Sequence, residues 1–368
     1  MRKGWEYKRW KEVLTIINGK NQSAVVDENG EYPIYGSGGI MGYANNWLCP
    51  ENCVIIGRKG NINKPIFVET KFWNVDTAFG LNANKEYLLP KFLYYFCLDY
   101  NFERHNKAVT IPSLTKVDLL KIDIPLPPKS TQLAIVTELD KINELIRLKK
   151  EQLKDFDNLA QSLFYEMFGD PVENEKGWEV KKIGDLALVK TGPFGSMLHK
   201  EDYICDGIPL VNPVHMKDFK IVPDLDFTIS KEKASELENY LLKSNDVVFA
   251  RRGDIGRCAI VSEAEQGFIC GTGSLFVRFS KEIESIFIMY IIRCDSFSKH
   301  LISKAKGATM LNINSNTIAD LRIPLPPLSL QRLFAQRIEQ IEREKSEVQK
   351  SIQDLETLLA SRMQYWFE

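Results

Sequence analysis

Two stretches of the chain carry the same narrow stripe of apolar residues on an otherwise polar background. Steps of four and three positions separate the apolar residues, which is the heptad spacing of helices that pair along a seam. A single lysine interrupts the spacing in each stretch, Lys149 in the first and Lys345 in the second. Each stretch therefore predicts one long helix that needs a partner for its single apolar face. The predicted seam consists of Leu139, Ile142, Ile146, Leu153 and Phe156 in the first helix, extended by Ile135, Ala160, Leu163 and Met167, and of Ile338, Ile341, Val348, Ile352 and Leu355 in the second, extended by Phe334 and Leu359.

The run Ile-Pro-Leu-Pro-Pro stands before each predicted helix, at residues 124–128 and again at 323–327. The offset of 199 residues (323 minus 124) continues without a gap through both helices. Two consecutive prolines cannot extend a helix backwards, and Ser130 or Thr131 can cap the first turn. Two helices of roughly 38 residues, at about 1.5 Å per residue, would form a rod on the order of 57 Å long. We predict that they form a coiled coil; the alternative is that each helix packs on its own domain.

The globular parts of the chain also repeat each other. An apolar run, two cations and a glycine turn occur at residues 53–62 and return at 246–255. Each copy predicts a buried strand followed by a tight turn. A second apolar run follows at residues 65–68 and 258–261, and a helical segment follows at 90–104 and 284–301. Because the spacings between these matches differ, we expect two domains that share a frame and differ in their insertions.

The predicted fold class is therefore α+β (mixed α/β), with an internal repeat of domain, long helix, domain and long helix. The expected boundaries are residues 1–124 for the first domain, 125–169 for the first helix, 170–323 for the second domain and 324–368 for the second helix. Two unlike copies of one scaffold, held apart by a rigid rod, favour recognition of a two-part extended target. DNA is the natural candidate, since dimeric readers place two half-sites roughly 34 Å or a multiple apart.

Composition describes an ordinary globular protein with room for more than one domain. The 368 residues are 44% hydrophobic and 26% charged, with a net charge of −1. Such a balance excludes a continuous basic coat, so nucleic-acid contacts must come from local patches. The chain starts with charged residues rather than an apolar run, which favours neither a signal peptide nor a membrane span. Seven scattered cysteines suggest reduced thiols and a cytoplasmic location.

Catalytic signatures are missing from the sequence. There is no phosphate loop of the GxxxxGK[ST] type, and the four histidines show no metal-ligand spacing. The glycine-rich residues 36–39 and 253–256 lack the strand-to-helix setting of a dinucleotide site, so turns are the better interpretation. The sequence predicts no active site, no bound metal and no cofactor of its own.

Candidate binding residues lie on the repeated turns and on two basic loops. Cations on tight turns can reach phosphates or guanine edges, and asparagine amides suit the major-groove edge of adenine. A solvated hairpin tip, or an asparagine that caps the next turn, is the alternative for each. The hairpin at residues 35–43 could stack on a base or be only a turn. The candidates are Arg58, Lys59, Asn61, Lys64, Lys107 and Thr110 in the first domain, and Arg251, Arg252, Asp254, Arg257, Lys304, Lys306, Thr309, Asn312 and Asn314 in the second.

The repeated Ile-Pro-Leu-Pro-Pro with its heptad helix, the strand followed by Arg-Arg-Gly-Asp-Ile-Gly, and the run Tyr-Pro-Ile-Tyr-Gly-x-Gly-Gly-Ile-x-Gly-Tyr together resemble one protein family. It is the DNA specificity subunit of type I restriction-modification systems, and the resemblance covers essentially the whole chain. It implies two target recognition domains, each reading one half of a bipartite, asymmetric sequence in double-stranded DNA. It also implies that the two helices form an antiparallel coiled-coil spacer.

The same resemblance implies partners that carry the chemistry. Two modification subunits would methylate adenine N6 with S-adenosylmethionine, and restriction subunits would use ATP and Mg to translocate and cleave DNA. Docking of the modification subunits is expected on the outer faces of helices 125–168 and 324–367. The family transfers no base-reading residues, because each domain reads its own sequence. The DNA contacts named above therefore rest on charge and turn geometry alone.

Two other interpretations stay open at this point. One is a specificity subunit whose single partner polypeptide combines nuclease and methyltransferase. The other is a noncatalytic coiled-coil scaffold with two protein-binding heads, for which no salt-dependent DNA affinity is expected, whereas a DNA reader loses affinity steeply as salt rises.

Overall fold

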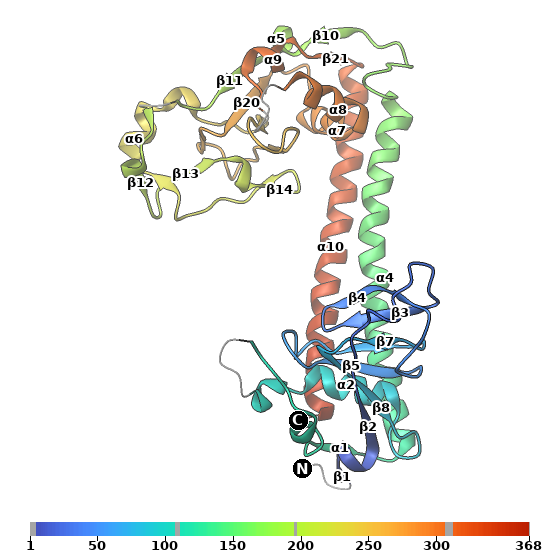
Figure 1. Cartoon of the computed structure of the whole chain (residues 1–368). Helices are drawn as coiled ribbons and strands as arrows, with labels where there is room; N and C mark the ends of the chain where they lie inside the picture. Colours follow the sequence, from blue (N-terminus) through green and yellow to red (C-terminus); the bar gives the residue numbers. More distant parts are fainter. Residues whose placement is uncertain (1–4, 107–110, 195–196, 306–311, 368) are drawn as a thin grey trace. The chain divides into compact units, whose positions relative to one another are not determined.

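The computed structural model describes residues 5–106, 111–194, 197–305 and 312–367. The chain forms two compact units, of which the first comprises Met1–Glu151 with Gln349–Glu368 and the second comprises Gln152–Val348. Each unit combines a β-rich domain with one end of both long helices, α4 (Lys129–Phe168) and α10 (Leu328–Phe367) (Figure 1). The architecture is therefore mixed α+β, as the repeat predicts.

The two long helices pack together in antiparallel fashion in each unit. In the first unit Glu138 pairs with Arg362 and Lys150 with Glu356, so the partner's number falls as the number on α4 rises. Among the predicted seam residues, Leu139, Ile142, Ile146 and Ile352 are buried in the first unit, and Ile338, Ile341 and Val348 are buried in the second. Leu153, Phe156 and Leu355 are half-buried. The predicted pairing is confirmed.

Lys345, which interrupts the heptad spacing, has two carboxylate partners for its ammonium group. Its Nζ lies 2.9 Å from Asp157 Oδ1 on α4 and 3.0 Å from Glu342 Oε1 on its own helix. A lysine at a seam position costs little when its ammonium group is paired and its stem lies along the helix surface. The break in the pattern is therefore a polar bridge between the helices.

The same helices also pack on the two domains, which the sequence analysis set out as an alternative. Ile135 and Leu139 of α4 join the core of the first domain, and Phe164 and Phe168 join that of the second. Near its C-terminus α4 buries Phe164 and Phe168 almost completely, whereas the predicted seam residues Leu163 and Met167 are only half-buried. Ala160, at the same end, is buried as the seam predicts. Phe164 and Phe168 are buried because they pack both on Phe287 of the domain and on Phe334 of α10.

The core sheets of the two domains have the same strand order. The first domain has an antiparallel sheet in the order β2-β8-β5-β6, and the second has β11-β20-β17-β18. All five residues of β5 and all four of β17 are buried, as continuous apolar runs require. The strands are β2 (Leu14–Asn18), β8 (Ala78–Ala83), β5 (Cys53–Gly57) and β6 (Ile66–Val68), and β11 (Ala187–Thr191), β20 (Ser274–Phe279), β17 (Val247–Ala250) and β18 (Cys258–Ile260). The repeat predicted from sequence thus holds strand by strand.

A second, smaller sheet lies beside the core sheet in each domain. Both domains have a parallel pair of strands in this sheet. The pair is β3 (Tyr32–Gly36) with β7 (Trp73–Asn74) in the first domain and β13 (Ile208–Val211) with β19 (Ile269–Cys270) in the second. The first domain adds β4 (Gly39–Ala44) to this pair, which forms a hairpin with β3. The second adds β12 (Tyr203–Ile204) and β16 (Thr228–Ile229), and a separate hairpin of β14 (Met216–Lys217) and β15 (Lys220–Ile221). The domains therefore differ mainly in what surrounds the parallel pair.

Each domain also has several short helices, some of which pack on its core sheet. The first domain has α1 (Trp10–Val13), α2 (Pro90–Asp99), η1 (Phe102–His105) and α3 (Lys116–Leu119). The second has α5 (Ile183–Leu186), α6 (Lys231–Glu236), α7 (Ser285–Arg293), α8 (Asp295–Lys304) and α9 (Ser315–Asp320), with short 3-10 turns η3 (Lys200–Asp202), η4 (Pro213–His215) and η5 (Glu238–Tyr240). The two predicted helical segments correspond to α2 with η1 and to α7 with α8.

A buried glutamine ties each domain to the start of its long helix. Gln132 accepts a hydrogen bond from the backbone N–H of Leu89 and donates to the carbonyls of Tyr87 and Pro127. Gln331 repeats this with the N–H of Glu284 and the carbonyl of Pro326. Both side chains are fully buried. Just before each helix, β9 (Asp123–Leu126) pairs with β1 (Glu6–Arg9), and β21 (Arg322–Pro324) pairs with β10 (Val180–Lys182).

Among the described residues, none of the helices combines the length and apolar character that a membrane span requires.

Candidate nucleic-acid interface

The repeated basic turn has the same backbone in both domains. It follows β5 in the first domain and β17 in the second, and a glycine with positive φ lies at its centre, Gly60 at 79° and Gly253 at 77°. The N–H two residues later closes the turn, from Ile62 to Gly60 O at 2.9 Å and from Ile255 to Gly253 O at 3.0 Å. Only glycine adopts this conformation without strain. The sequence match therefore reflects one conserved turn geometry within this chain.

Two further segments are held against this turn by matching hydrogen bonds. The N–H of Arg58 donates to Thr77 O at 2.8 Å, and that of Arg251 donates to Gly273 O at 2.9 Å. The carbonyl of Arg58 accepts from Leu114, and that of Arg251 accepts from Ile313. The segments that begin at residues 111 and 312 thus lie at the basic turn, with isolated bridges from Lys59 to Ser113 and from Arg252 to Asn312.

The loop after the parallel strand completes the surface. In the first domain a Cβ at Gly60 would lie 3.9 Å from Ser37 Oγ, and one at Gly38 would lie 3.8 Å from Asn61 Nδ2. In the second domain Arg257 Nη1 donates to Pro213 O at 3.2 Å, and the N–H of Gly273 donates to Asn212 Oδ1. Each domain therefore brings together three loops at one edge of its sheets: the basic turn, the loop before β8 or β20, and the loop after β3 or β13. The segment that begins at residue 111 or 312, the returning segment, lies with them.

In the second domain, the side chains at the basic turn are fixed by contacts with neighbouring side chains. Arg251 is only 7% exposed, and its Nε donates to Asn312 Oδ1 at 3.3 Å. The guanidinium carbon lies 4.6 Å from the ring centre of Phe194, a residue that the sequence analysis did not single out. Arg257 forms an ion pair with Asp254 at 2.7 Å. The cations of this turn are thus arranged in advance of any ligand.

Arg251 is an unusual cation in the part of the chain that the structure describes. Its Nη1 is buried and has no hydrogen-bond partner there, and no carboxylate among those residues forms an ion pair with it. Burial and the neighbouring Arg252 lower the pKa of Arg251. An uncompensated buried charge is costly, and a cation perturbed by burial and by a like charge is a candidate for a functional contact.

Side chains in the first domain are more open. Arg58, Lys59, Asn61 and Lys64 are all exposed. Arg58 donates from Nη1 to the carbonyl of Asp76 at 3.4 Å, and its guanidinium carbon lies 5.8 Å from the ring centre of Phe79. The residue at the place of Asn312 is Ser113, as the two isolated bridges show. The cations at the turn of the first domain are therefore all accessible, unlike Arg251.

The remaining candidates fall into two groups. Lys304 is exposed at the end of α8, and Asn314 caps α9, since its Oδ1 accepts from the N–H of Thr317 at 2.8 Å. Asn314 thus makes the capping interaction that was the alternative for it. Lys107, Thr110, Lys306 and Thr309 lie outside the described residues.

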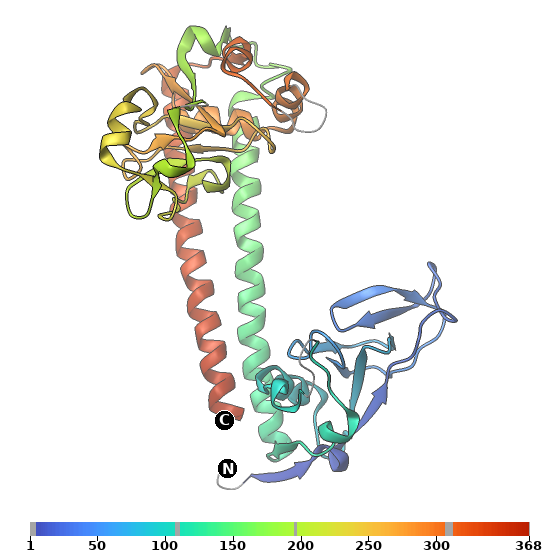
Figure 2. The same ribbon diagram turned by 60° about the vertical axis from the view of Figure 1, so that its left-hand side comes forward.

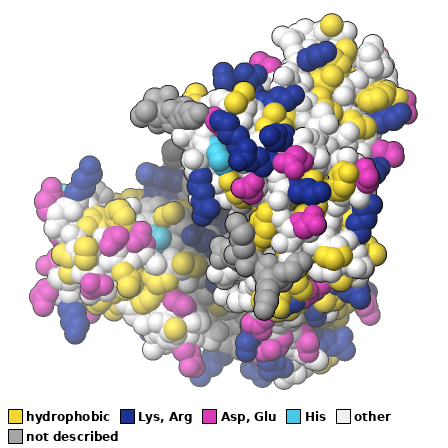
Figure 3. All heavy atoms as spheres, turned by 90° about the horizontal axis from the view of Figure 1, so that it is seen from below, with side chains coloured by type: hydrophobic (Ala, Val, Ile, Leu, Met, Phe, Trp, Pro, Cys, Tyr) yellow, Lys and Arg dark blue, Asp and Glu magenta, His cyan; other side chains and the backbone are white. Residues whose placement is uncertain are grey.

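The described residues contain no cluster of three or more His, Cys, Asp or Glu side chains suited to a metal ion. Burial raises the pKa of Cys53 and of Cys258 to about 12, so both thiols are neutral at physiological pH and poor nucleophiles. On the face drawn in Figure 3, Lys and Arg side chains are interspersed with acidic and apolar ones rather than forming a continuous coat.

A family model described as the type I restriction modification DNA specificity domain matches residues 2–155 and 175–357. The chain is 23% identical over 393 residues to the type I restriction enzyme MjaVIII specificity subunit of Methanocaldococcus jannaschii, covering 96% of this chain and 92% of that protein. It is 21% identical over 352 residues to the EcoBI specificity subunit of Escherichia coli, covering 88% and 73%.

Two solved structures share the fold along nearly the whole chain. The S subunit of a type I restriction-modification system from M. genitalium superimposes with a TM-score of 0.60 at 15% identity, covering 99% of this chain and 96% of that one. A chain from a study of complex assembly and conformational transition of a type I R-M system gives a TM-score of 0.65 at 17% identity, covering 99% and 97%.

Proposed function

The chain belongs to the family of type I restriction-modification specificity subunits, noncatalytic proteins that recognise a DNA target sequence, and we propose that its two domains each read one half of a bipartite, asymmetric target. The observation that carries this proposal is the repeated loop surface. The same turn, returning segment and parallel-strand loop occur in both domains. Within them the second domain has Asp254 where the first has Asn61, and Asn312 where the first has Ser113. One scaffold with two sets of side chains suits two different half-sites.

The second domain offers the stronger candidates for base reading. Asn312 is exposed, and Arg251 fixes its amide because the guanidinium donates to Oδ1. Oδ1 keeps a second lone pair, so the amide can donate to N7 and accept from N6, which is the bidentate pair that asparagine makes with adenine. Arg251 and Arg252 add donors on the same surface. In the first domain the exposed Arg58, Lys59 and Lys64 suit phosphate contacts, which position the protein without reading sequence.

Modification subunits would dock on the long helices. Within the first unit α4 leaves Leu145 and Leu148 exposed, next to a shallow groove lined by Thr137, Asp140, Lys141, Glu144 and Leu145. Within the second unit Leu159 and Leu333 are exposed. Exposed apolar residues on helices that already have a paired seam indicate a further interface. Two modification subunits, using S-adenosylmethionine, and restriction subunits, using ATP and Mg, would supply the chemistry that this chain lacks.

The complex would act in the cytoplasm, where thiols stay reduced. All seven cysteines are free, and six of them are buried. Such usage fits a reducing compartment.

Mapping of methylated adenines tests the proposed function. The chain is produced together with the methyltransferase encoded next to it, and the host DNA is read for modified adenines. A bipartite motif with a fixed gap is the expected result. If an intact, purified complex leaves no modified motif and its DNA affinity does not fall with salt, the chain is a protein scaffold and the proposal is wrong.

A further inference from the structure

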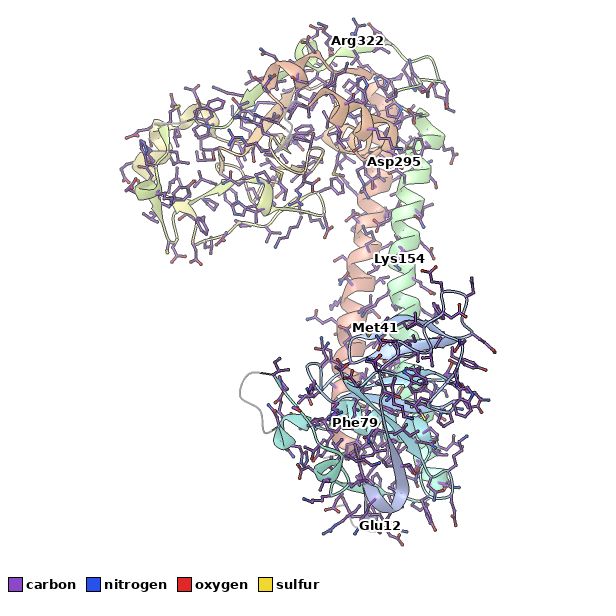
Figure 4. All side chains as sticks on the ribbon, in the orientation of Figure 1. Glu12, Met41, Phe79, Lys154, Asp295 and Arg322 are labelled. Carbon is purple, nitrogen blue, oxygen red and sulfur yellow. The ribbon has the colours of Figure 1, made fainter. Side chains whose placement is uncertain are left out.

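The hairpin of β3 and β4 in the first domain contains a bulge that presents one residue. Ile34 pairs with Gly42 and Tyr35 pairs with Ile40, so Met41 is an extra residue on β4 without a partner across the ladder. Bulges re-aim a side chain and commonly occur beside functional sites. Met41 is labelled on this strand in Figure 4.

Large apolar side chains are exposed along the same strand. Met41 is 64% exposed, Ile40 is 56% exposed and Tyr43 is 47% exposed. The strand β4 is at the edge of its three-stranded sheet. Leaving such side chains in water forgoes the stabilisation that burial gives, and three of them on one short edge strand favour a binding surface there.

The patch is continuous with the basic turn. The tip of the hairpin, Ser37 and Gly38, lies against Gly60 and Asn61. The Met41 sulphur lies only 2.6 Å from where a Cβ of Gly36 would be, so the Met41 side chain extends along the hairpin toward its tip. Within the first unit, Figure 2 shows the backbone of this hairpin standing away from α4 and α10.

At the equivalent place in the second domain the exposed apolar residue is Val214, 64% exposed, which lies on η4 rather than on an edge strand. There the chain after β13 forms η4 and the hairpin of β14 and β15, which folds back on the core. Phe219 at the tip of that hairpin accepts from the N–H of Ile260 through its carbonyl, and the Arg293 guanidinium carbon lies 4.4 Å from its ring centre. The exposed hairpin is therefore a feature of the first domain.

We propose that Met41, with Ile40 beside it, is an apolar wedge that enters DNA at a base step next to the phosphates bound by the Arg58 turn. This inference rests on the proposed function, because it requires the first domain to lie on DNA. Apolar side chains that enter from the minor groove partly unstack one step and kink the duplex. A thioether on an unbranched chain adapts to the irregular space between base pairs. Continuity with the cations favours DNA over a protein as the occupant.

The test uses the complex with its methyltransferase partner and a duplex that carries its methylated motif. The fluorescent base 2-aminopurine is placed in turn at each position of the half-site that the first domain reads. We expect the wild-type complex to raise its fluorescence at one step, which reports unstacking. The double variant Ile40→Thr with Met41→Gln removes that signal and weakens binding about tenfold, while the methylated motif stays the same.

The matched control is Leu98→Gln, which changes an exposed apolar residue on α2 and leaves both signals intact. If the wild-type complex binds the duplex with no unstacked step, or if the double variant keeps the signal and the affinity, the wedge is refuted. If the double variant binds DNA normally but loses the methyltransferase on a sizing column, the hairpin docks protein and the inference is also refuted. A wild-type complex that binds no DNA refutes the proposed function itself.

Discussion

The two basic turns share a backbone but use their arginines in opposite ways. Arg58 is exposed, whereas Arg251 is buried beneath Phe194 and bound to Asn312. An exposed arginine keeps its rotamer freedom and interacts as a general cation, while a buried one is fixed and can serve recognition only in one geometry. The comparison teaches that a duplicated scaffold can diverge in function through what packs on the turn rather than through the turn itself.

The largest expected effect comes from removing the anchors that both domains share. Gln132→Leu leaves the N–H of Leu89 and two carbonyls without a partner, whereas Gln331→Leu leaves one N–H and one carbonyl. Each unsatisfied buried group costs about 1–3 kcal/mol. We expect Gln132→Leu to destabilise its unit by more, which denaturant unfolding followed by tryptophan fluorescence will measure. Equal losses of unfolding free energy in the two variants would contradict this expectation, because the number of hydrogen bonds would then not determine the cost.

Next in size is the effect of Arg251→Ala on sequence specificity. Without its guanidinium the amide of Asn312 is free to rotate, so we expect about 1–3 kcal/mol less discrimination at one base of the half-site read by the second domain. Methylation mapping of the variant complex should show that one position relaxed and the other half-site unchanged. Asn312→Ala should relax the same position. A uniform loss of methylation with an unchanged motif would instead assign Arg251 to phosphate binding.

A smaller effect is expected for Arg58→Ala. An exposed cation that contacts phosphate contributes to affinity for every sequence alike, and its loss lowers the slope of log affinity against log salt by about 1. The motif should stay the same. Binding titrations over a range of salt concentrations measure the slope, and Lys85→Ala, at another exposed cation of the first domain, is the control. A changed motif would show that the first domain also reads bases through its turn arginine.

The smallest expected effect concerns acid stability of the helix pair in the first unit. Hydrogen bonds from Arg362 hold the pKa of Glu138 below its ordinary value, with a further bond from Trp366. A carboxyl group with a lowered pKa stabilises the fold above its unfolded pKa and loses that contribution as pH falls through the folded value. Glu138→Gln should therefore lower Tm at pH 7 slightly, and the difference from the wild type should shrink as pH falls below the unfolded pKa of about 4.3. Thermal melts at several pH values between about 7 and 3 measure this difference in Tm. A difference between variant and wild type that stays constant with pH would contradict the prediction.

Some parts of the candidate site were predictable from sequence and others were not. The turn after β5 and β17 could be found because a glycine with positive φ and flanking cations leaves a local signature. Phe194 could not, because it lies 57 positions before Arg251 (251 minus 194) and nothing in its neighbourhood marks it. Asn314 was ambiguous, since asparagine suits both a cap and a base contact, and only its distance to Thr317 shows the cap.

The sequence by itself determined the internal repeat, the two long helices and the pairing of their seams. These features depend on periodicity and on local stops such as Pro128, which act over a few residues. The tertiary structure alone decided that α4 directs Phe164 and Phe168 into a domain core, that Arg251 is buried, and that a bulge exposes Met41. Each of these depends on which distant segment packs against the residue. Burial is a property of the whole fold, and periodicity cannot specify it.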